Sequence, residues 1–174
     1  QRGAQVELIS GPTQLASIHS AIHCTRVENA AQMFDAALQV FPSADVGILC
    51  AAVADFTPTQ CVDEKIKREK GEQHLNLVPT QDIAAALGAM KKAGQRLVGF
   101  ALETHNEQEN ALAKLKKKNL DFIVLNSLRE KGAGFMHDTN KISIITATNQ
   151  KDFPLKHKAE VAKDIIDFLC ATYQ

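Results

Sequence analysis

The feature that most constrains the fold is the alternation of short apolar segments with stretches of helical periodicity. Val46–Val53 is a continuous apolar run, typical of a central parallel strand covered on both faces. Strands alternating with helices predict an α/β fold, which we expect to be a three-layer, Rossmann-like, mostly parallel sheet. The other expected strands are Val6–Ser10, Leu97–Leu102, Phe122–Leu125 and Ile142–Ala147, and the helices are 29–41, Ile83–Ala93, Glu107–Lys118 and Glu160–Ala171.

Length, charge and the length of the apolar runs limit the classes of function that the chain could have. A chain of 174 residues with 45% hydrophobic side chains is long enough for one domain with a full core. The 20 basic residues balance the 20 acidic ones, which disfavours general nucleic-acid binding, since such binders usually carry a basic excess. The longest apolar run, Val46–Ala54, is far shorter than the ~20 residues of a membrane span. We therefore expect neither a nucleic-acid nor a membrane partner.

The cysteines indicate a reduced, cytoplasmic protein. Cys24, Cys50, Cys61 and Cys170 form no CxxC motif and no close pair. Cys50 lies inside the long apolar run, where a thiol is expected to be a small buried hydrophobe.

His19 and His23 have the spacing of two metal ligands on one helix face. The pair lacks the intervening Glu of a zinc motif, and no later cluster supplies a third ligand. A solvated loop or helix end is therefore favoured over a metal site.

A long polar segment interrupts the alternation. Residues from Thr57 to Glu72 show no apolar periodicity and lead to a short β-like segment, Leu75–Val78. Loops of this length inside a compact domain are usually functional or disordered. This one contains four cations, Lys65, Lys67, Arg68 and Lys70.

Three features could carry chemistry at the carboxyl ends of the strands, where α/β folds bind ligands. Small residues, Ala51–Ala54, would let a flat ligand approach the backbone, and Asp55 could serve a metal ion or a sugar hydroxyl, or simply form a turn. The cationic loop and a lysine cluster at 114–118 suggest a nucleotide triphosphate, although lysines at a helix end also complement the helix dipole. No P-loop and no GxGxxG motif occurs.

Five segments follow one another along nearly the whole chain: Gly3–Thr13, Ala51–Phe56, Lys65–Lys67, Gly99–Thr104 and Lys118–Asn126. In sequence, order and spacing, these segments resemble the phosphopantothenoylcysteine synthetase family, the synthetase half of a bacterial bifunctional coenzyme A biosynthesis protein.

The resemblance implies a ligase that joins 4′-phosphopantothenate to cysteine, using CTP with Mg²⁺ as cofactor. The acid would first form an acyl-cytidylate, which the cysteine amine would then convert to an amide. Such chemistry needs positioning and charge neutralisation rather than a protein nucleophile. CTP is expected to be preferred over ATP, because backbone groups can read the edge of the pyrimidine.

The resemblance also implies the site residues. Lys65 would be the catalytic lysine of a lid that closes over the triphosphate, and Asp55 a metal ligand. The expected nucleotide-binding residues are Leu49, Cys50, Ala51, Asp55, Lys65, Gln81, Asp82, Ile83, Ala84, Phe100, Lys114 and Lys118.

Two departures from the family pattern stand out. The family's Asn-Pro-Asp-Ile turn reads Thr80-Gln81-Asp82-Ile83 here, which puts side-chain contacts from the first two positions in doubt. Residues 1–174 are also expected to form a single synthetase domain that lacks the family's first strand, first helix and phosphate-binding loop.

The long polar loop is expected to serve as a lid and dimerisation element, giving a homodimer, and fusion to a phosphopantothenoylcysteine decarboxylase is expected from the resemblance. Two other functions remain open. The chain could be a nucleotide-binding module that does not catalyse, or an NAD(P)-dependent oxidoreductase. The missing glycine fingerprint and the absence of a Tyr-x-x-x-Lys pair count against the oxidoreductase.

Overall fold

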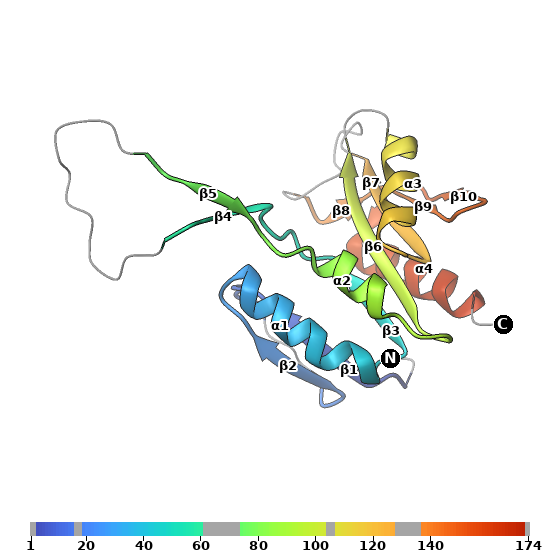
Figure 1. The fold of residues 1–174 in the computed structure, drawn as a ribbon. Helices are drawn as coiled ribbons and strands as arrows, with labels where there is room; N and C mark the ends of the chain where they lie inside the picture. Colours follow the sequence, from blue (N-terminus) through green and yellow to red (C-terminus); the bar gives the residue numbers. More distant parts are fainter. Residues whose placement is uncertain (1–2, 16–18, 61–73, 104–106, 128–136, 173–174) are drawn as a thin grey trace. The chain divides into compact units, whose positions relative to one another are not determined.

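The structure is a computed structural model that describes residues 3–15, 19–60, 74–103, 107–127 and 137–172 (Figure 1). The chain forms two compact units. The first unit comprises Gln1–Gln39 and Ala51–Ile83, and the second comprises Val40–Cys50 and Ala84–Gln174.

The first unit contains two strand pairs and a helix. β1 (Val6–Ser10) runs parallel to β2 (Ile22–Arg26), and β4 (Phe56–Pro58) runs antiparallel to β5 (Leu77–Pro79). Helix α1 (Ala30–Val40) begins as its sequence predicts. The Asn29 side chain accepts a hydrogen bond from the amide of Gln32 (2.9 Å), and the Gln32 side chain accepts one from the amide of Glu28 (2.7 Å), a variant of the capping box.

The second unit is built on a five-stranded sheet in the order β10-β9-β7-β6-β3. β3 (Val46–Leu49), β6 (Arg96–Glu103) and β7 (Phe122–Ser127) are parallel, whereas β9 (Ile142–Ile145) and β10 (Gln150–Asp152) add an antiparallel hairpin. The predicted α/β class is thus confirmed, with a mixed sheet. The smaller elements are the 3-10 turn η1 (Phe41–Ser43) and the pair formed by β8 (Thr139–Asn140) and β11 (Lys156–His157).

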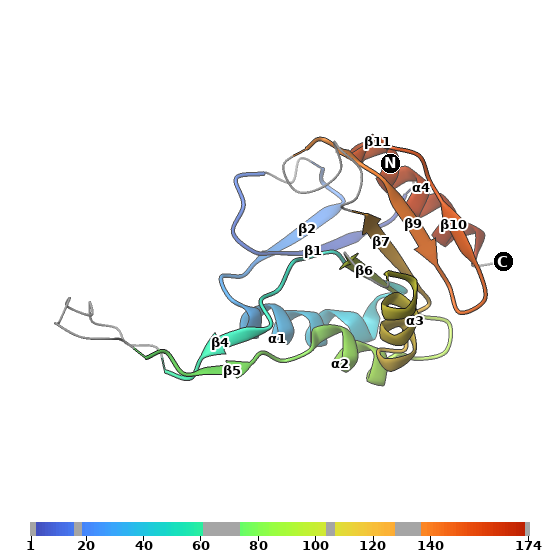
Figure 2. The same cartoon turned by 90° about the horizontal axis from the view of Figure 1, so that it is seen from above.

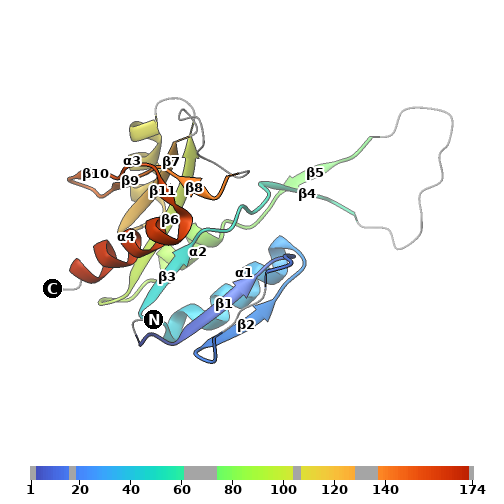
Figure 3. The same ribbon diagram turned by 180° about the vertical axis from the view of Figure 1, so that it is seen from behind.

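Helices cover both faces of this sheet, because successive strand residues point to opposite sides. Phe122 and Val124 pack in one core with Val161 and Ile165 of α4 (Lys158–Ala171). The other face is covered by α3 (Glu107–Lys117), which contacts β6 and β7 (Figure 2). Figure 3 shows α4 from behind, lying along its face of the sheet.

The structure corrects the prediction for the long apolar run. β3 ends at Leu49, because its pairing with β6 ends at Gly99 and an apolar run stays a strand only where a partner supplies hydrogen bonds. Within the described residues β3 is the last strand of its sheet rather than a central one, and its Ile48 is 39% exposed. Cys50, expected to be buried, is exposed.

Two local predictions also change. The segment around His23 is strand β2, so His19 and His23 do not share a helix face. His23 instead contacts the Glu7 carboxylate of the neighbouring strand at 2.7 Å. Helix α2 (Ile83–Met90) ends before the predicted Ala93.

Candidate functional site

In the first unit, the structure brings the end of the Ala-rich segment next to the predicted turn. The backbone amide of Thr80 donates to the carbonyl of Asp55 (2.9 Å), and the Thr80 hydroxyl donates to the carbonyl of Ala54 (2.6 Å). Phe56 then pairs with Pro79 as β4 and β5 begin. The Ala54–Asp55 segment and the turn from Thr80 to Asp82 are therefore joined at one point, the base of the β4–β5 hairpin.

Thr80 stands at a position where the sequence departs from the family pattern. Its side chain makes a contact within the chain, because its hydroxyl donates to the Ala54 carbonyl at the hairpin base. Asp55, Gln81 and Asp82 are exposed beside it, so a ligand can reach the side chains of these predicted residues, while Ala51 is exposed upstream.

Lys65, the predicted catalytic lysine, lies outside the described residues, as do Lys67, Arg68 and Lys70. The arms that lead toward this segment are described. The amide of Thr59 donates to the carbonyl of Asn76 (3.0 Å), which continues the antiparallel pairing beyond β4 and β5.

In the second unit, Leu49 is the last residue of β3 and Cys50 follows it. Leu49 pairs with Gly99, and β6 continues through Phe100 to Glu103 after β3 has ended. The register therefore places Leu49, Cys50 and Phe100 at neighbouring positions near the carboxyl end of β3. Phe100 is partly buried and packs against the core shared with α4.

Lys114 and Lys118 lie at the end of α3, on the opposite face of the sheet from that core. The side chain of Lys114 is exposed and that of Lys118 is half-buried. Helix α2 packs close to them. A Cβ atom on Gly88 of α2 would collide with the carbonyl oxygen of Lys118, so only glycine permits this approach. The structure thus places the backbone of Lys118 against α2, the helix that starts with Ile83 and Ala84. Neither lysine lies on the face of the sheet that carries Phe100.

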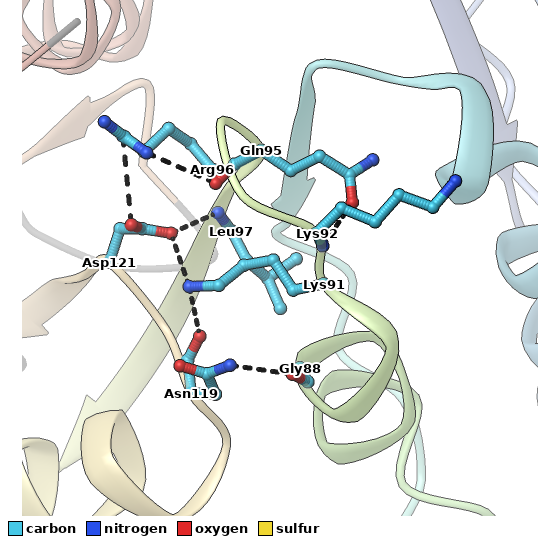
Figure 4. Close-up of polar contacts among 8 residues, drawn as sticks. All are labelled: Gly88, Lys91, Lys92, Gln95, Arg96, Leu97, Asn119 and Asp121. Carbon is cyan, nitrogen blue, oxygen red and sulfur yellow. Dashed lines mark hydrogen bonds and ion pairs between the residues drawn. The ribbon is translucent and has the colours of Figure 1, made fainter.

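A polar cluster that the sequence did not predict holds this region together (Figure 4). The Asp121 carboxylate accepts hydrogen bonds from the Lys91 ammonium (2.9 Å) and the Leu97 amide (2.7 Å), and lies 3.8 Å from Arg96. Asn119 connects the same lysine to Gly88. The signal that could have revealed this cluster is the Lys-Asn-Leu-Asp sequence directly after the helix, where an asparagine often ends an α-helix.

Asp55 is suited to share a magnesium ion with a nucleotide. Mg²⁺ keeps several waters and is commonly held by one or two carboxylates together with substrate phosphates, so a single exposed carboxylate fits. Among the described residues, no group of three His, Cys, Asp or Glu side chains is arranged to hold a metal ion by itself. A metal here would therefore be bound together with its nucleotide.

Among the described residues, Asp152 of β10 has a clear pKa shift, and it is not one of the predicted site residues. Hydrogen bonds from Ser143 and Gln150 lower the pKa of the Asp152 carboxyl. An open hollow of about 470 Å³ beside β2 and α1 is lined by Arg26, Glu28 and Asp35, and includes none of the predicted site residues.

Comparison with known proteins gives a consistent picture. Residues 1–173 match the family described as "DNA/pantothenate metabolism flavoprotein C-terminal domain". The chain is 42% identical over 172 residues to the coenzyme A biosynthesis bifunctional protein CoaBC of Bacillus subtilis, covering 98% of the chain and 42% of that protein. It is 56% identical over 165 residues to a cysteine/cysteine sulfinic acid decarboxylase of an unknown prokaryote, covering 94% of the chain and 46% of that protein. The chain thus spans less than half the length of these relatives.

Solved structures agree with the fold. The crystal structure of the C-terminal domain of CoaBC is 36% identical, with a TM-score of 0.79 over 98% of this chain and 77% of that one. A DNA/pantothenate metabolism flavoprotein from Streptococcus pneumoniae shares the fold at 20% identity, with a TM-score of 0.81 over 98% of this chain and 82% of that one. These matches confirm the resemblance that the motifs indicated. No helix in the described part of the chain is long and apolar enough to span a membrane.

Proposed function

The chain belongs to the family of DNA/pantothenate metabolism flavoprotein C-terminal domains, and from that premise we propose that it ligates 4′-phosphopantothenate to cysteine with CTP and Mg²⁺. The observation that carries this proposal is the base of the β4–β5 hairpin. There, Thr80 ties the end of the Ala-rich segment, Ala54 and Asp55, to the turn that leads into α2. The similarity to the coenzyme A biosynthesis bifunctional protein CoaBC of Bacillus subtilis, 42% identical over 172 residues, supports the proposal.

In the proposed first step, a carboxylate oxygen of 4′-phosphopantothenate attacks the α-phosphorus of CTP. The bond to the β-phosphate oxygen breaks, pyrophosphate leaves, and an acyl-cytidylate forms. The chain needs no nucleophile for this step, only cations and hydrogen-bond donors around the phosphates. Lys114 and Lys118 would supply ammonium groups, and Lys65 would supply another from the long loop.

In the second step, the cysteine amine attacks the acyl carbon. The bond to the phosphate oxygen breaks, CMP leaves, and loss of a proton from nitrogen gives the amide. The exposed Asp55 carboxylate would hold Mg²⁺ with the nucleotide, and the ion would neutralise phosphate charge when bound. The backbone from Leu49 to Ala51 and the turn at Gln81–Ala84 would hold the base and ribose, which is the basis for the expected preference for CTP over ATP.

Pyrophosphate release tests the reaction. The protein should release pyrophosphate from CTP and Mg²⁺ only when 4′-phosphopantothenate is present, and should release CMP when cysteine is then added. Equal turnover with ATP would contradict the CTP preference. Binding of CTP without any release would instead indicate a nucleotide-binding module.

Lys65 offers a direct test of the loop. Lys65→Gln should slow pyrophosphate release about 100- to 1,000-fold, as expected for loss of a preorganised charged donor, with little change in thermal stability. The matched control is Lys70→Gln, in the same loop but outside the matched motif. If both variants keep near-normal release, the loop's cations are solvated charges and Lys65 is not catalytic.

We also propose that the chain works as a homodimer and as part of a longer protein that includes a decarboxylase. The β4–β5 hairpin supports the dimer, since Phe56, Leu77 and Val78 are 58%, 51% and 40% exposed and such apolar patches mark interaction sites. Light scattering at micromolar concentration should give twice the subunit mass. A monomeric mass would contradict this proposal.

A further inference from the structure

The end of helix α3 has the geometry of a Schellman motif. The amide of Leu120 donates to the carbonyl of Leu115 (3.0 Å), and the amide of Asn119 donates to the carbonyl of Lys116 (3.3 Å). Asn119 has a φ of 50°, the left-handed conformation that asparagine and glycine tolerate best. Lys118 is therefore the capping residue of α3, and its position depends on how the next residue is held.

Asn119 is held from two sides. Its side-chain amide donates to the carbonyl of Gly88 in α2 (2.8 Å), and its own carbonyl accepts a hydrogen bond from the Lys91 ammonium (2.7 Å) (Figure 4). The missing Cβ of Gly88 lets the two backbones come this close. Asn119 thus connects the end of α3 directly to α2.

The partner lysine is itself fixed. The Lys91 ammonium also binds Asp121 Oδ2 (2.9 Å), the same oxygen that accepts the Leu97 amide (2.7 Å). The side chain of Lys91 is only 13% exposed. The hydrogen bonds of Asn119 are therefore linked through Lys91 to Asp121, the residue before β7, and through Asp121 to Leu97, which is fully buried in β6.

From this geometry we propose that Asn119 is a positioning residue for nucleotide binding, acting through Lys118. By tying the end of α3 to α2 it sets the place of the Lys118 ammonium relative to the first turn of α2, where Ala84 lies. This inference rests on the proposed function, because it assumes that Lys118 meets the phosphates of a nucleotide.

The alternative is that Asn119 has a purely structural role. Substitution of Asn119 by glycine distinguishes this role from a positioning role. Asn119→Gly keeps the left-handed helix end, since glycine is the most favourable residue there, but removes the side-chain bond to Gly88. The free energy of unfolding should fall only by the contribution of one lost hydrogen bond. Affinity for CTP with Mg²⁺, measured by calorimetric titration, should fall about 5- to 10-fold, because the Lys118 ammonium is no longer held in place. The matched control is Asn149→Gly in the β9–β10 turn, where the side chain accepts from the Gln150 amide (2.8 Å). It should bind CTP normally.

A double-mutant cycle then identifies the residue through which Asn119 acts. In a Lys118→Gln background, Asn119→Gly should cause no further loss of affinity. In a Lys114→Gln background, it should still weaken binding about 5- to 10-fold. If Asn119→Gly does not fold, Lys91→Met tests the same tie from its other side and should show the same dependence on Lys118.

The outcomes separate this inference from the function beneath it. If the unsubstituted protein does not bind CTP, the proposed function fails. If it binds CTP and Lys118→Gln weakens binding, but Asn119→Gly leaves the affinity unchanged or lowers it equally in both lysine backgrounds, Asn119 has no positioning role and the inference is overturned. The inference is also overturned if Lys118→Gln binds CTP normally.

Discussion

The end of α3 and the base of the β4–β5 hairpin both carry predicted nucleotide-binding residues, but they are held by different means. At the end of α3, Asn119, Lys91 and Asp121 form a continuous set of hydrogen bonds that reaches the buried sheet. At the hairpin base, Thr80 makes two hydrogen bonds among exposed residues. We infer that the first region is preformed, whereas the second adjusts when the nucleotide binds.

The largest expected effect comes from closing the space between α2 and α3. Gly88→Ala would place a methyl group against the carbonyl of Lys118, and a backbone atom cannot move aside as a flexible side chain can. The free energy of unfolding should fall by about 1–3 kcal/mol or more, measured by urea denaturation. The control is Gly11→Ala, whose nearest contact is the end of Met33 at 4.0 Å. Equal stability of the two variants would show that α3 is not held against α2.

The next effect should come from Asp121→Asn, which keeps the side chain's size but removes its charge. Lys91 then loses its ionic partner at 2.9 Å in a site where both side chains are largely buried. Unfolding free energy should drop by roughly 1.5–3 kcal/mol, as for other hydrogen bonds to charged groups. Asp35→Asn, on the exposed face of α1, should stay within about 0.5 kcal/mol. A similar small change at Asp121 would mean that the cluster does not hold this region.

Thr80→Val tests the hairpin base with an equally shaped side chain. Losing the bond from the hydroxyl to the Ala54 carbonyl (2.6 Å) should lower CTP affinity about 3- to 10-fold while costing only about 0.5–1.5 kcal/mol of stability. Thr57→Val, on the exposed β4 strand, is the control and should bind normally. Normal binding by both variants would contradict a role for the hairpin base.

The smallest effect is expected at the hydrogen bond between Ser143 of β9 and Asp152 of β10, which is exposed to solvent and serves as a benchmark for exposed contacts. Ser143→Ala removes the hydrogen bond that most lowers the pKa of Asp152, so that pKa should rise toward its ordinary value of 3.8 in an NMR titration. Because the folded pKa is depressed, the stabilisation from Asp152 is present above the unfolded pKa and is lost as pH falls through the folded one. An unchanged pKa would refute this cause.

Sequence predicted the strand and helix order well wherever burial decides the structure. The segments that became β6, β7 and β9 are mostly apolar, and the structure buries most of their apolar side chains. The prediction was wrong where hydrogen-bonded pairing between strands, rather than burial, determines the structure. The apolar run beyond Leu49 has no strand partner past Gly99. Strand β2, which the sequence did not predict, forms where its residues pair with β1.

The roles of the candidate site residues stay predictions, and the sequence did not predict how these residues are arranged. The motifs selected Asp55, Lys114 and Lys118, but no sequence pattern shows that Thr80 bonds to Ala54 or that Asp121 reaches Lys91 thirty residues away. These are long-range contacts, which depend on how the strands pair. Lys65 stays a prediction, since it lies outside the described residues.

Residue-resolved amide hydrogen exchange, with and without CTP and Mg²⁺, tests the central contrast most directly. The amides of Leu97 and Asp121 should be strongly protected in the free protein and unchanged by the nucleotide. The amide of Thr80, bonded to the Asp55 carbonyl, should exchange quickly in the free protein and become at least roughly tenfold more protected on binding. Equal protection at all three amides before binding, or no change at Thr80 after it, would contradict the account.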